Sequence, residues 1–113
     1  MNRGDVVIVD WPFSDLSGSK LRPAVVMESD FLNTLVDDSI YVKVQSQRYG
    51  IPGTEVELDP AVETLSGLVK FCYASCKDIL TREQSLVHHT LGVLSDAAMQ
   101  QIEMCLKTVL ELR

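Results

Sequence analysis

The sequence predicts an α+β fold in which five mostly antiparallel strands are followed by a C-terminal helix. Residues 40–47 and 54–59 alternate apolar and polar side chains, which is the pattern of strands buried on one face. After Ser95, apolar side chains return at helical spacing. Five mostly antiparallel strands with one C-terminal helix make a small α+β domain.

Three further strands complete the predicted sheet. The apolar run at residues 6–11 predicts a buried strand, and residues 24–28 predict its partner after a long polar loop. Residues 69–79 predict a long strand with two different faces. One face carries small apolar side chains suited to a tight core, and the other carries larger or polar ones, namely Phe71, Tyr73, Ser75 and Lys77.

Three helices are expected. Ser29 and Asp30 can cap a short helix at residues 31–35. Thr81, with Gln84 three residues later, has the spacing of a capping box and predicts a second short helix before Gly92 interrupts the chain. Ser95 caps the last helix, whose apolar positions are Met99, Ile102, Leu106, Val109 and Leu110.

Length and composition predict one globular domain over residues 1–113, because a chain with 46% hydrophobic residues can bury a core. The N-terminus has no signal-peptide pattern and the chain has no apolar run long enough for a membrane span, so we expect a cytoplasmic protein without a membrane partner. The three cysteines lack metal-ligand spacing. We therefore expect free thiols, no metal and no cofactor.

The net charge of −6 counts against generic binding of nucleic acid, which requires phosphate neutralisation by Lys and Arg. An acidic total allows only a local cationic groove with salt-sensitive binding. Lys20, Arg22, Lys43, Arg48 and Lys77 lie on different segments that one face of a small barrel can gather.

The polar loop at residues 17–26 is the most informative segment of the chain. Its sequence is Ser-Gly-Ser-Lys-Leu-Arg-Pro-Ala-Val-Val, so two cations precede an apolar strand. Pro23 restricts Arg22 to an extended backbone and is tolerated at a strand's first residue or edge. Arg22 is thus predicted at a loop–strand junction, where its planar guanidinium can face a phosphate. The alternative is a solvated loop with two surface cations.

Several of these segments, taken in order, resemble the PemK/MazF family of messenger-RNA endonucleases, the toxins of bacterial toxin–antitoxin pairs. The resemblance rests on Gly4-Asp5 near the start, on residues 17–24, on Ser46-Gln47, on Gly67-Leu68 and on residues 92–95. It covers nearly the whole chain. It implies an SH3-like, mostly antiparallel β-barrel with short helices and a C-terminal helix, assembled as a homodimer.

The resemblance also implies an activity, namely sequence-selective, metal-independent cleavage of single-stranded RNA. Arg22 matches the family's catalytic Arg, and Ser46 matches the family's Ser. Gln45 stands where the family commonly has a Thr that partners the Arg, and an amide has no titratable proton to relay. On one strand, Gln45 and Ser46 would point to opposite faces. The expected catalytic group is therefore Arg22, Gln45 and Ser46.

The expected RNA-binding residues surround that group and include aromatic side chains for stacking on bases. They are Ser19, Lys20, Lys43, Gln47, Arg48, Phe71, Tyr73, Ser75 and Lys77. An equally weighted alternative places Phe71 and Tyr73 in a dimer interface. The expected partners are single-stranded RNA, a cognate antitoxin protein, a second copy of the chain and, through the antitoxin, operator DNA.

Two rival functions remain at this level. One is a catalytically weakened family member that binds RNA, DNA or antitoxin without cleavage, which Gln45 and the acidic total favour. The other is an SH3-like interaction module without a nucleic-acid role, which fold analogy alone supports.

Overall fold

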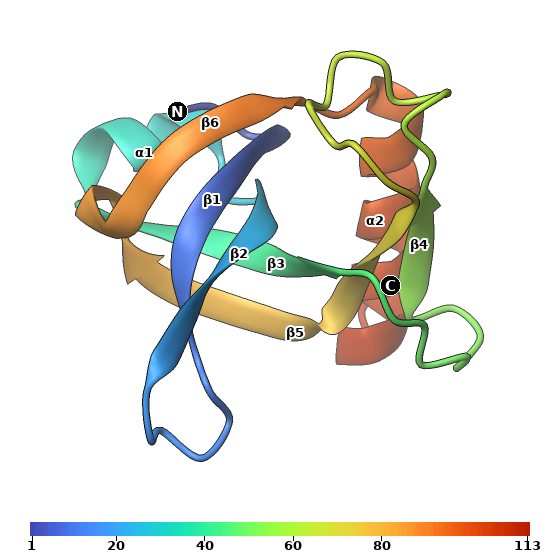
Figure 1. The fold of residues 1–113 in the computed structure, drawn as a ribbon, viewed down its shortest axis with the longest axis horizontal. Helices are drawn as coiled ribbons and strands as arrows, with labels where there is room; N and C mark the ends of the chain where they lie inside the picture. Colours follow the sequence, from blue (N-terminus) through green and yellow to red (C-terminus); the bar gives the residue numbers. More distant parts are fainter.

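The computed structural model describes residues 1–113, which form one curved antiparallel sheet with two α-helices and a short 3-10 helix (Figure 1). The six strands are ordered β4-β5-β3-β2-β1-β6 across the sheet. Their bounds are β1 Asp5–Pro12, β2 Ser19–Val26, β3 Asp38–Gln45, β4 Glu55–Leu58, β5 Cys72–Glu83 and β6 Val87–Val93. The predicted α+β class is confirmed. The edge strands β4 and β6 do not pair with each other, so the sheet is not a strictly closed barrel.

Two of the predicted helices are confirmed together with their caps. α1 (Asp30–Leu35) begins after Ser29, whose hydroxyl accepts from the Leu32 amide at 3.2 Å. α2 (Asp96–Leu110) begins after Ser95, whose hydroxyl accepts from the Ala98 amide at 3.1 Å. α2 lies against β4 and β5, as Figure 1 shows. None of the helices is long and apolar enough to span a membrane.

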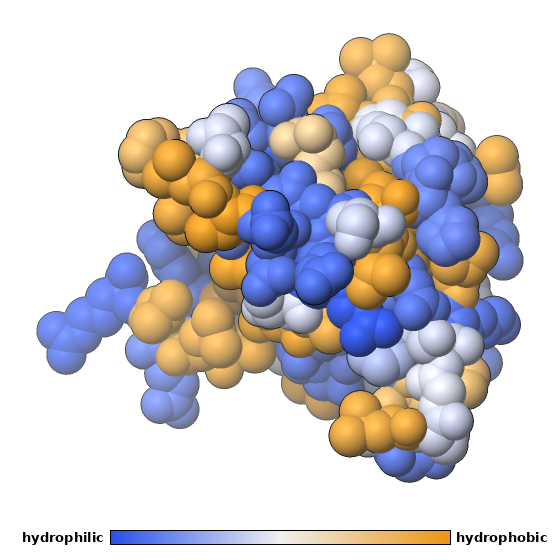
Figure 2. Space-filling model, turned by 90° about the vertical axis from the view of Figure 1, so that its left-hand side faces the viewer, coloured by the Kyte–Doolittle hydropathy of each residue, from blue (hydrophilic) through white to orange (hydrophobic).

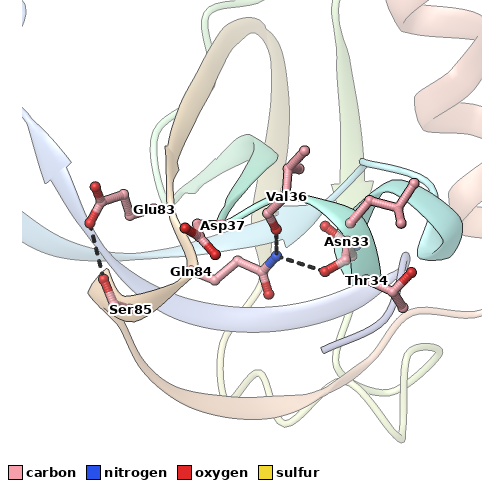
Figure 3. A pocket seen from close by; sticks show the side chains of 8 residues that line it. Asn33, Thr34, Val36, Asp37, Glu83, Gln84 and Ser85 are labelled. Carbon is pink, nitrogen blue, oxygen red and sulfur yellow. Dashed lines mark hydrogen bonds between the residues drawn. The ribbon is translucent and has the colours of Figure 1, made fainter.

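The helix predicted after Thr81 is wrong. β5 continues to Glu83, and only the 3-10 turn η1 (Gln84–Leu86) separates it from β6. The Gln84 side chain does not close a capping box. Its amide instead donates to the carbonyls of Asn33 and Val36 at 3.0 Å each, at the end of α1 (Figure 3). Pairing of β6 with β1 therefore overrides the local capping signal.

Gly92 lies within β6 and does not break the chain. A Cβ at this position would overlap the Leu65 carbonyl and the backbone of Ser66. The Val93 amide donates to the same Leu65 carbonyl at 2.9 Å. The close approach available only to glycine thus holds the loop between β4 and β5 against the end of β6.

Two apolar clusters occupy opposite faces of the sheet. The larger one lies beneath α2 and includes Cys72, Ala74 and Cys76, as predicted for the small face of β5. The smaller one, called here the Tyr41 cluster, consists of Val7, Val9, Trp11, Ala24, Val26 and Tyr41. Alternation along β1, β2 and β3 supplies both clusters, because successive side chains of a strand point to opposite faces.

The side of the molecule that carries α1 has a mixed surface. Figure 2 shows apolar and polar groups interleaved there, without one continuous apolar patch. The apolar contribution of α1 comes from Phe31, Leu32 and Leu35, which are all exposed. α1 buries none of its residues, so hydrogen bonds at its two ends hold it in place.

Candidate functional site

Strands β2 and β3 separate where the predicted site residues lie. The two strands pair only over Ala24–Val26 and Tyr41–Lys43. Continuing that register would place Arg22 opposite Gln45, but the strands have already parted. The hollow between them has a volume of about 450 Å³. It is lined by residues 20–23 of β2, residues 44–46 at the end of β3, residues 67–70 of the loop before β5, Cys72 of β5 and Leu91 of β6.

A second hollow of about 410 Å³ adjoins the first along the end of β3. It is lined by Arg22, Lys43, Gln45, Ser46, Gln47, Arg48 and Tyr49. Arg22, Gln45 and Ser46 line both hollows. The structure therefore brings the three residues expected to be catalytic to one place, together with Lys20, Lys43, Gln47 and Arg48 from the expected binding set.

Arg22 lies inside β2 and not at a loop–strand junction, because β2 already begins at Ser19. It pairs with Val9 of β1, and Pro23 pairs with Ile8. Since β3 joins β2 only from Ala24 onward, Pro23 occupies a stretch where one side of β2 is an open edge. The open edge explains why proline is tolerated there and why Arg22 is half-buried beside a hollow.

Ser46 is also placed differently from the prediction. The strand expected to reach residue 47 ends at Gln45, and the chain bends at Ser46. Strict alternation would send the two side chains to opposite faces, but the bend allows both residues to line the same hollows. The Gln45 amide donates to the Gln47 carbonyl at 3.0 Å, which leaves the Gln45 carbonyl oxygen free to accept.

The cations that border the hollows are mostly unpaired. The four ion pairs of the chain use Arg3, Arg48, Lys77 and Arg82. Lys20, Arg22 and Lys43 are in none of them. Their charge is available to an anion, so this part of an acidic protein can bind phosphate locally.

The loop that follows β3 is held by Glu55 of β4. The Glu55 carboxylate accepts from the amides of Tyr49 and Gly50 at 3.1 and 2.6 Å, and Arg48 Nε lies 3.8 Å from it. Lys77 Nζ lies 4.0 Å from the centre of the Tyr49 ring. Hydrogen bonding to Tyr49 and the nearby Asp78 carboxylate raise the pKa of Lys77 above its usual value, so Lys77 stays a cation at the rim.

The predicted aromatic face of β5 is present in part. Phe71 and Tyr73 pack edge to face with ring centres 5.5 Å apart, and Phe71 is exposed. Ser75 pairs with Lys43 of β3 and with Glu55 of β4, which places it on the same face of the sheet as Tyr73. Ser75 is 1% exposed and its hydroxyl donates to Asp78 at 2.7 Å.

Ser19 lies apart from both hollows. It is exposed at the start of β2 and is engaged with Asp10. Hydrogen bonds from Ser19 and then from Arg82 lower the pKa of Asp10, and Arg82 Nη2 lies 3.0 Å from that carboxylate. His88 and His89 are exposed residues of β6 and also lie away from the hollows.

Sequence reasoning missed two residues that border the hollows, Tyr49 and Lys70. Lys70 is a cation immediately before the aromatic strand, which was a usable signal. Tyr49 is held by hydrogen bonding of its loop to Glu55, and no local sequence pattern predicts these hydrogen bonds.

A further hollow of about 440 Å³ lies beside α1 and differs in chemistry (Figure 3). Asp37 and Glu83 contribute carboxylates, and it contains no cation. The Gln84 amide is occupied by backbone carbonyls there. This hollow is unsuited to phosphate, so the candidate site is the one between β2 and β3.

Comparison with known proteins agrees with this architecture. The family model described as PemK-like, MazF-like toxin of type II toxin-antitoxin system matches residues 2–110. No curated protein sequence matches the chain.

Solved structures share the fold at low sequence identity. An endoribonuclease in complex with its cognate antitoxin from Mycobacterial species superposes with a TM-score of 0.80 at 23% identity, covering 100% of this chain and 97% of that one. A MazE–MazF structure from Deinococcus radiodurans gives 0.77 at 17% identity, covering 100% and 98%. At such identities these likenesses show the fold alone.

Proposed function

The chain belongs to the PemK-like, MazF-like toxin family of type II toxin–antitoxin systems, and from this we propose that it is a sequence-selective endoribonuclease that cleaves single-stranded RNA without a metal ion. The observation that carries the proposal is the parting of β2 and β3 around Arg22, Gln45 and Ser46. An unpaired guanidinium there faces a hollow bordered by other unpaired cations.

Cleavage that uses the RNA's own 2′-hydroxyl as nucleophile needs three contributions. The hydroxyl must lose a proton, the negatively charged phosphorane must be stabilised, and the 5′-oxygen must gain a proton. The products are a 2′,3′-cyclic phosphate and a 5′-hydroxyl. Arg22 is assigned to the phosphorane, because a guanidinium stays charged and can donate to two phosphate oxygens at once.

Gln45 and Ser46 are assigned to the same phosphate. Gln45 can orient it through hydrogen bonds but has no titratable proton. Ser46 supplies a hydroxyl beside Gln45, because the chain bends between the strand end and the following loop. The proton transfers are therefore divided between Ser46 and Arg22. The Ser46 hydroxyl accepts the 2′-hydroxyl proton as it passes its own proton to a phosphate oxygen, and the Arg22 guanidinium donates a proton to the 5′-oxygen and regains one from water. Gln45 is a positioning residue.

The proposed RNA path leads from the cations to the aromatic pair. Lys20, Lys43, Gln47 and Arg48 border the hollows and suit the backbone phosphates. Tyr73 pairs with Gln45 across β3 and β5, so the Tyr73–Phe71 pair begins one strand away from the catalytic group. Bases that have left the phosphate site can stack there.

The proposed partners follow the family. They are a cognate antitoxin that neutralises the toxin, a second copy of this chain, and operator DNA reached through the antitoxin, all in the cytoplasm. One of the similar solved structures is described as an endoribonuclease in complex with its cognate antitoxin, and another as MazE–MazF. A homodimer would double the cationic groove without changing the sign of the total charge.

A second candidate function is favoured by one observation, the Gln45 amide at the expected position of a hydroxyl. In this alternative the chain binds RNA, DNA or the antitoxin but has lost most of its cleavage activity. Measuring both RNA binding and RNA cleavage by the same protein distinguishes the two functions.

The test is RNA cleavage in EDTA by the purified protein and by Arg22→Ala. We expect wild-type cleavage to persist in EDTA and the variant to lose about a hundredfold or more, the effect of removing one donor to a developing oxyanion. Arg113→Ala removes an equal charge from the exposed C-terminus and is the matched control.

Three outcomes would count against the proposal. Full activity of Arg22→Ala would remove Arg22 from the chemistry. A large fall in its melting temperature would assign Arg22 to the fold instead. Binding of RNA without cleavage by the wild type would select the second candidate function.

A further inference from the structure

Three residues stand side by side across the strands next to the proposed catalytic group. Tyr73 of β5 pairs directly with Gln45 of β3 on one side and with Glu57 of β4 on the other. Directly paired residues of antiparallel strands point to the same face, with their Cβ atoms about 5 Å apart. Arg22 extends the row beyond Gln45 in the continued register of β2 and β3. The row therefore presents a guanidinium, an amide, a phenol ring and a carboxylate, in that order.

The last two members of the row are available to a ligand. Glu57 is exposed and takes part in none of the chain's ion pairs. It differs in this from its neighbour Glu55, whose carboxylate is enclosed by the loop after β3. The Tyr73 ring is held by the edge-to-face contact with Phe71. A fixed ring beside a free carboxylate is an arrangement that can both stack on a base and accept from its edge.

Resting on the proposed function, we propose that Tyr73 and Glu57 form a base-binding subsite that prefers guanine. Guanine presents two adjacent donors, N1–H and the N2 amino group, that match the two oxygens of a carboxylate. Adenine and cytosine present one amino group beside a ring-nitrogen acceptor, and the N3–H of uracil lies between two carbonyl oxygens. A carboxylate repels those acceptors, so the second donor of guanine distinguishes it.

The dimensions of the sheet agree with a subsite next to a phosphate at Arg22. Paired strands lie about 4.8 Å apart, so Tyr73 lies one strand step from Gln45. Arg22 lies on the other side of Gln45, across the hollow where β2 has parted from β3, so its separation from Tyr73 exceeds the roughly 10 Å of two paired steps. Tyr73 can thus receive a base while Arg22 holds a phosphate of an adjoining nucleotide.

The charge of Glu57 should have opposite effects on the binding of guanine and of the other bases, which makes its role testable. A free carboxylate beside an RNA path weakens the binding of every nucleotide through repulsion of the phosphates. Only a base that donates to both carboxylate oxygens offsets that repulsion. Removing the charge should therefore weaken the binding of one base and strengthen that of the others.

The experiment compares the trinucleotides UpGpU, UpIpU and UpUpU, titrated in EDTA into the full-length protein. Inosine lacks the N2 amino group and otherwise keeps the shape of guanosine. We expect the wild type to bind UpGpU about tenfold more tightly than either of the others. In Glu57→Gln, binding of UpGpU should weaken and binding of UpUpU should strengthen, so that the preference disappears.

Matched variants separate recognition from general charge and from folding. Glu83→Gln makes the same change of charge on an exposed residue at the far end of β5 and should leave the preference intact. Tyr73→Phe should keep affinity for all three ligands, because it retains the ring, whereas Tyr73→Ala should weaken all three. Melting curves of each variant confirm that it is folded.

The outcomes distinguish this inference from the function on which it rests. Equal binding of UpGpU and UpIpU by the wild type, or an unchanged preference in Glu57→Gln, overturns the guanine subsite while Arg22-dependent cleavage stands. Absence of binding to all three trinucleotides, together with absence of Arg22-dependent cleavage, overturns both.

Discussion

One face of the sheet differs completely between its two ends. At one end Val26 and Ala24 of β2 and Tyr41 of β3 are fully buried in the Tyr41 cluster. At the other end the same face carries Arg22 of β2 and Gln45 of β3, both only half-buried. The strands and their alternation are the same at both ends. The difference is that the strands stay paired at the first end and have separated at the second.

The separation coincides along β3 with an irregularity in the pairing of β3 with β5. Between Val42 and Lys43 of β3 the register with β5 shifts, so that Val42 pairs with Ile79 but Lys43 pairs with Ser75. The intervening residues of β5 form a bulge that turns Lys77 toward the Tyr49 ring. Bulges bend strands and occur frequently beside active sites, where they re-aim side chains.

Stability and the proposed function thus occupy different ends of one surface. The buried end contributes to the free energy of unfolding by removing apolar side chains from water. The open end carries Lys20, Arg22 and Lys43, which take part in none of the chain's ion pairs. Substitutions at the buried end should therefore change the free energy of unfolding, whereas substitutions at the open end should change RNA binding or cleavage.

The largest expected effect is on stability at the buried end. Tyr41→Ala should reduce the free energy of unfolding by about 3–5 kcal/mol, the range for truncating a large buried side chain. Tyr41→Phe should lose less, because it keeps the ring. Urea unfolding followed by circular dichroism measures both changes.

If the two ends are independent, Tyr41→Ala should keep the RNA cleavage that is assigned to the open end. At a temperature where the variant is still folded, its RNA cleavage should match that of the wild type. If the folded variant lost as much cleavage as Arg22→Ala, the two ends would be coupled.

Much of the buried core on both faces of the sheet could be predicted from the sequence. Burial of one face of a strand or helix produces a periodic pattern of apolar residues that can be recognised in the sequence. This pattern predicted the alternation in β3, the small face of β5 and the apolar positions of α2. The caps at Ser29 and Ser95 are likewise local signals. The error after Thr81 arose because a capping pattern is also local, whereas β6 is stabilised by pairing with β1, far away in sequence.

The open end could be predicted only in its residue types. Arg22, Gln45 and the cations were identified from sequence, but the bend at Ser46 and the bulge in β5 depend on how distant strands register with one another. Ser75 shows the limit clearly. Period-two alternation correctly places it on the Tyr73 face, but it does not reveal that Ser75 is 1% exposed there or that its hydroxyl donates to Asp78.

A smaller effect is expected from salt at the open end. With three or four phosphate contacts, each adding about 0.7 to the logarithmic slope for a single strand, raising salt from 50 to 200 mM should weaken RNA binding roughly twentyfold to fiftyfold. Fluorescence anisotropy with a labelled RNA in EDTA measures the dissociation constants.

Charge-removing variants assign that slope to the open end. Lys43→Ala should lower the slope by about 0.7, whereas Lys107→Ala, on the exposed surface of α2, should leave it unchanged. A flat salt dependence in the wild type would contradict the phosphate site and favour an interaction module without a role in RNA binding.

The smallest expected effect concerns Gln45, the positioning residue of the proposed catalytic group. Gln45→Thr should raise the single-turnover rate of RNA cleavage several-fold, because it restores a hydroxyl that can take part in proton transfer beside Arg22. Gln45→Val is the matched control, since valine has the shape of threonine without the hydroxyl and both suit a strand. Equal rates in the two variants would mean that the hydroxyl does not limit the reaction. Gln45 would then no longer favour a weakened enzyme, and the bend that brings Ser46 to the same hollow would account for the proton transfer.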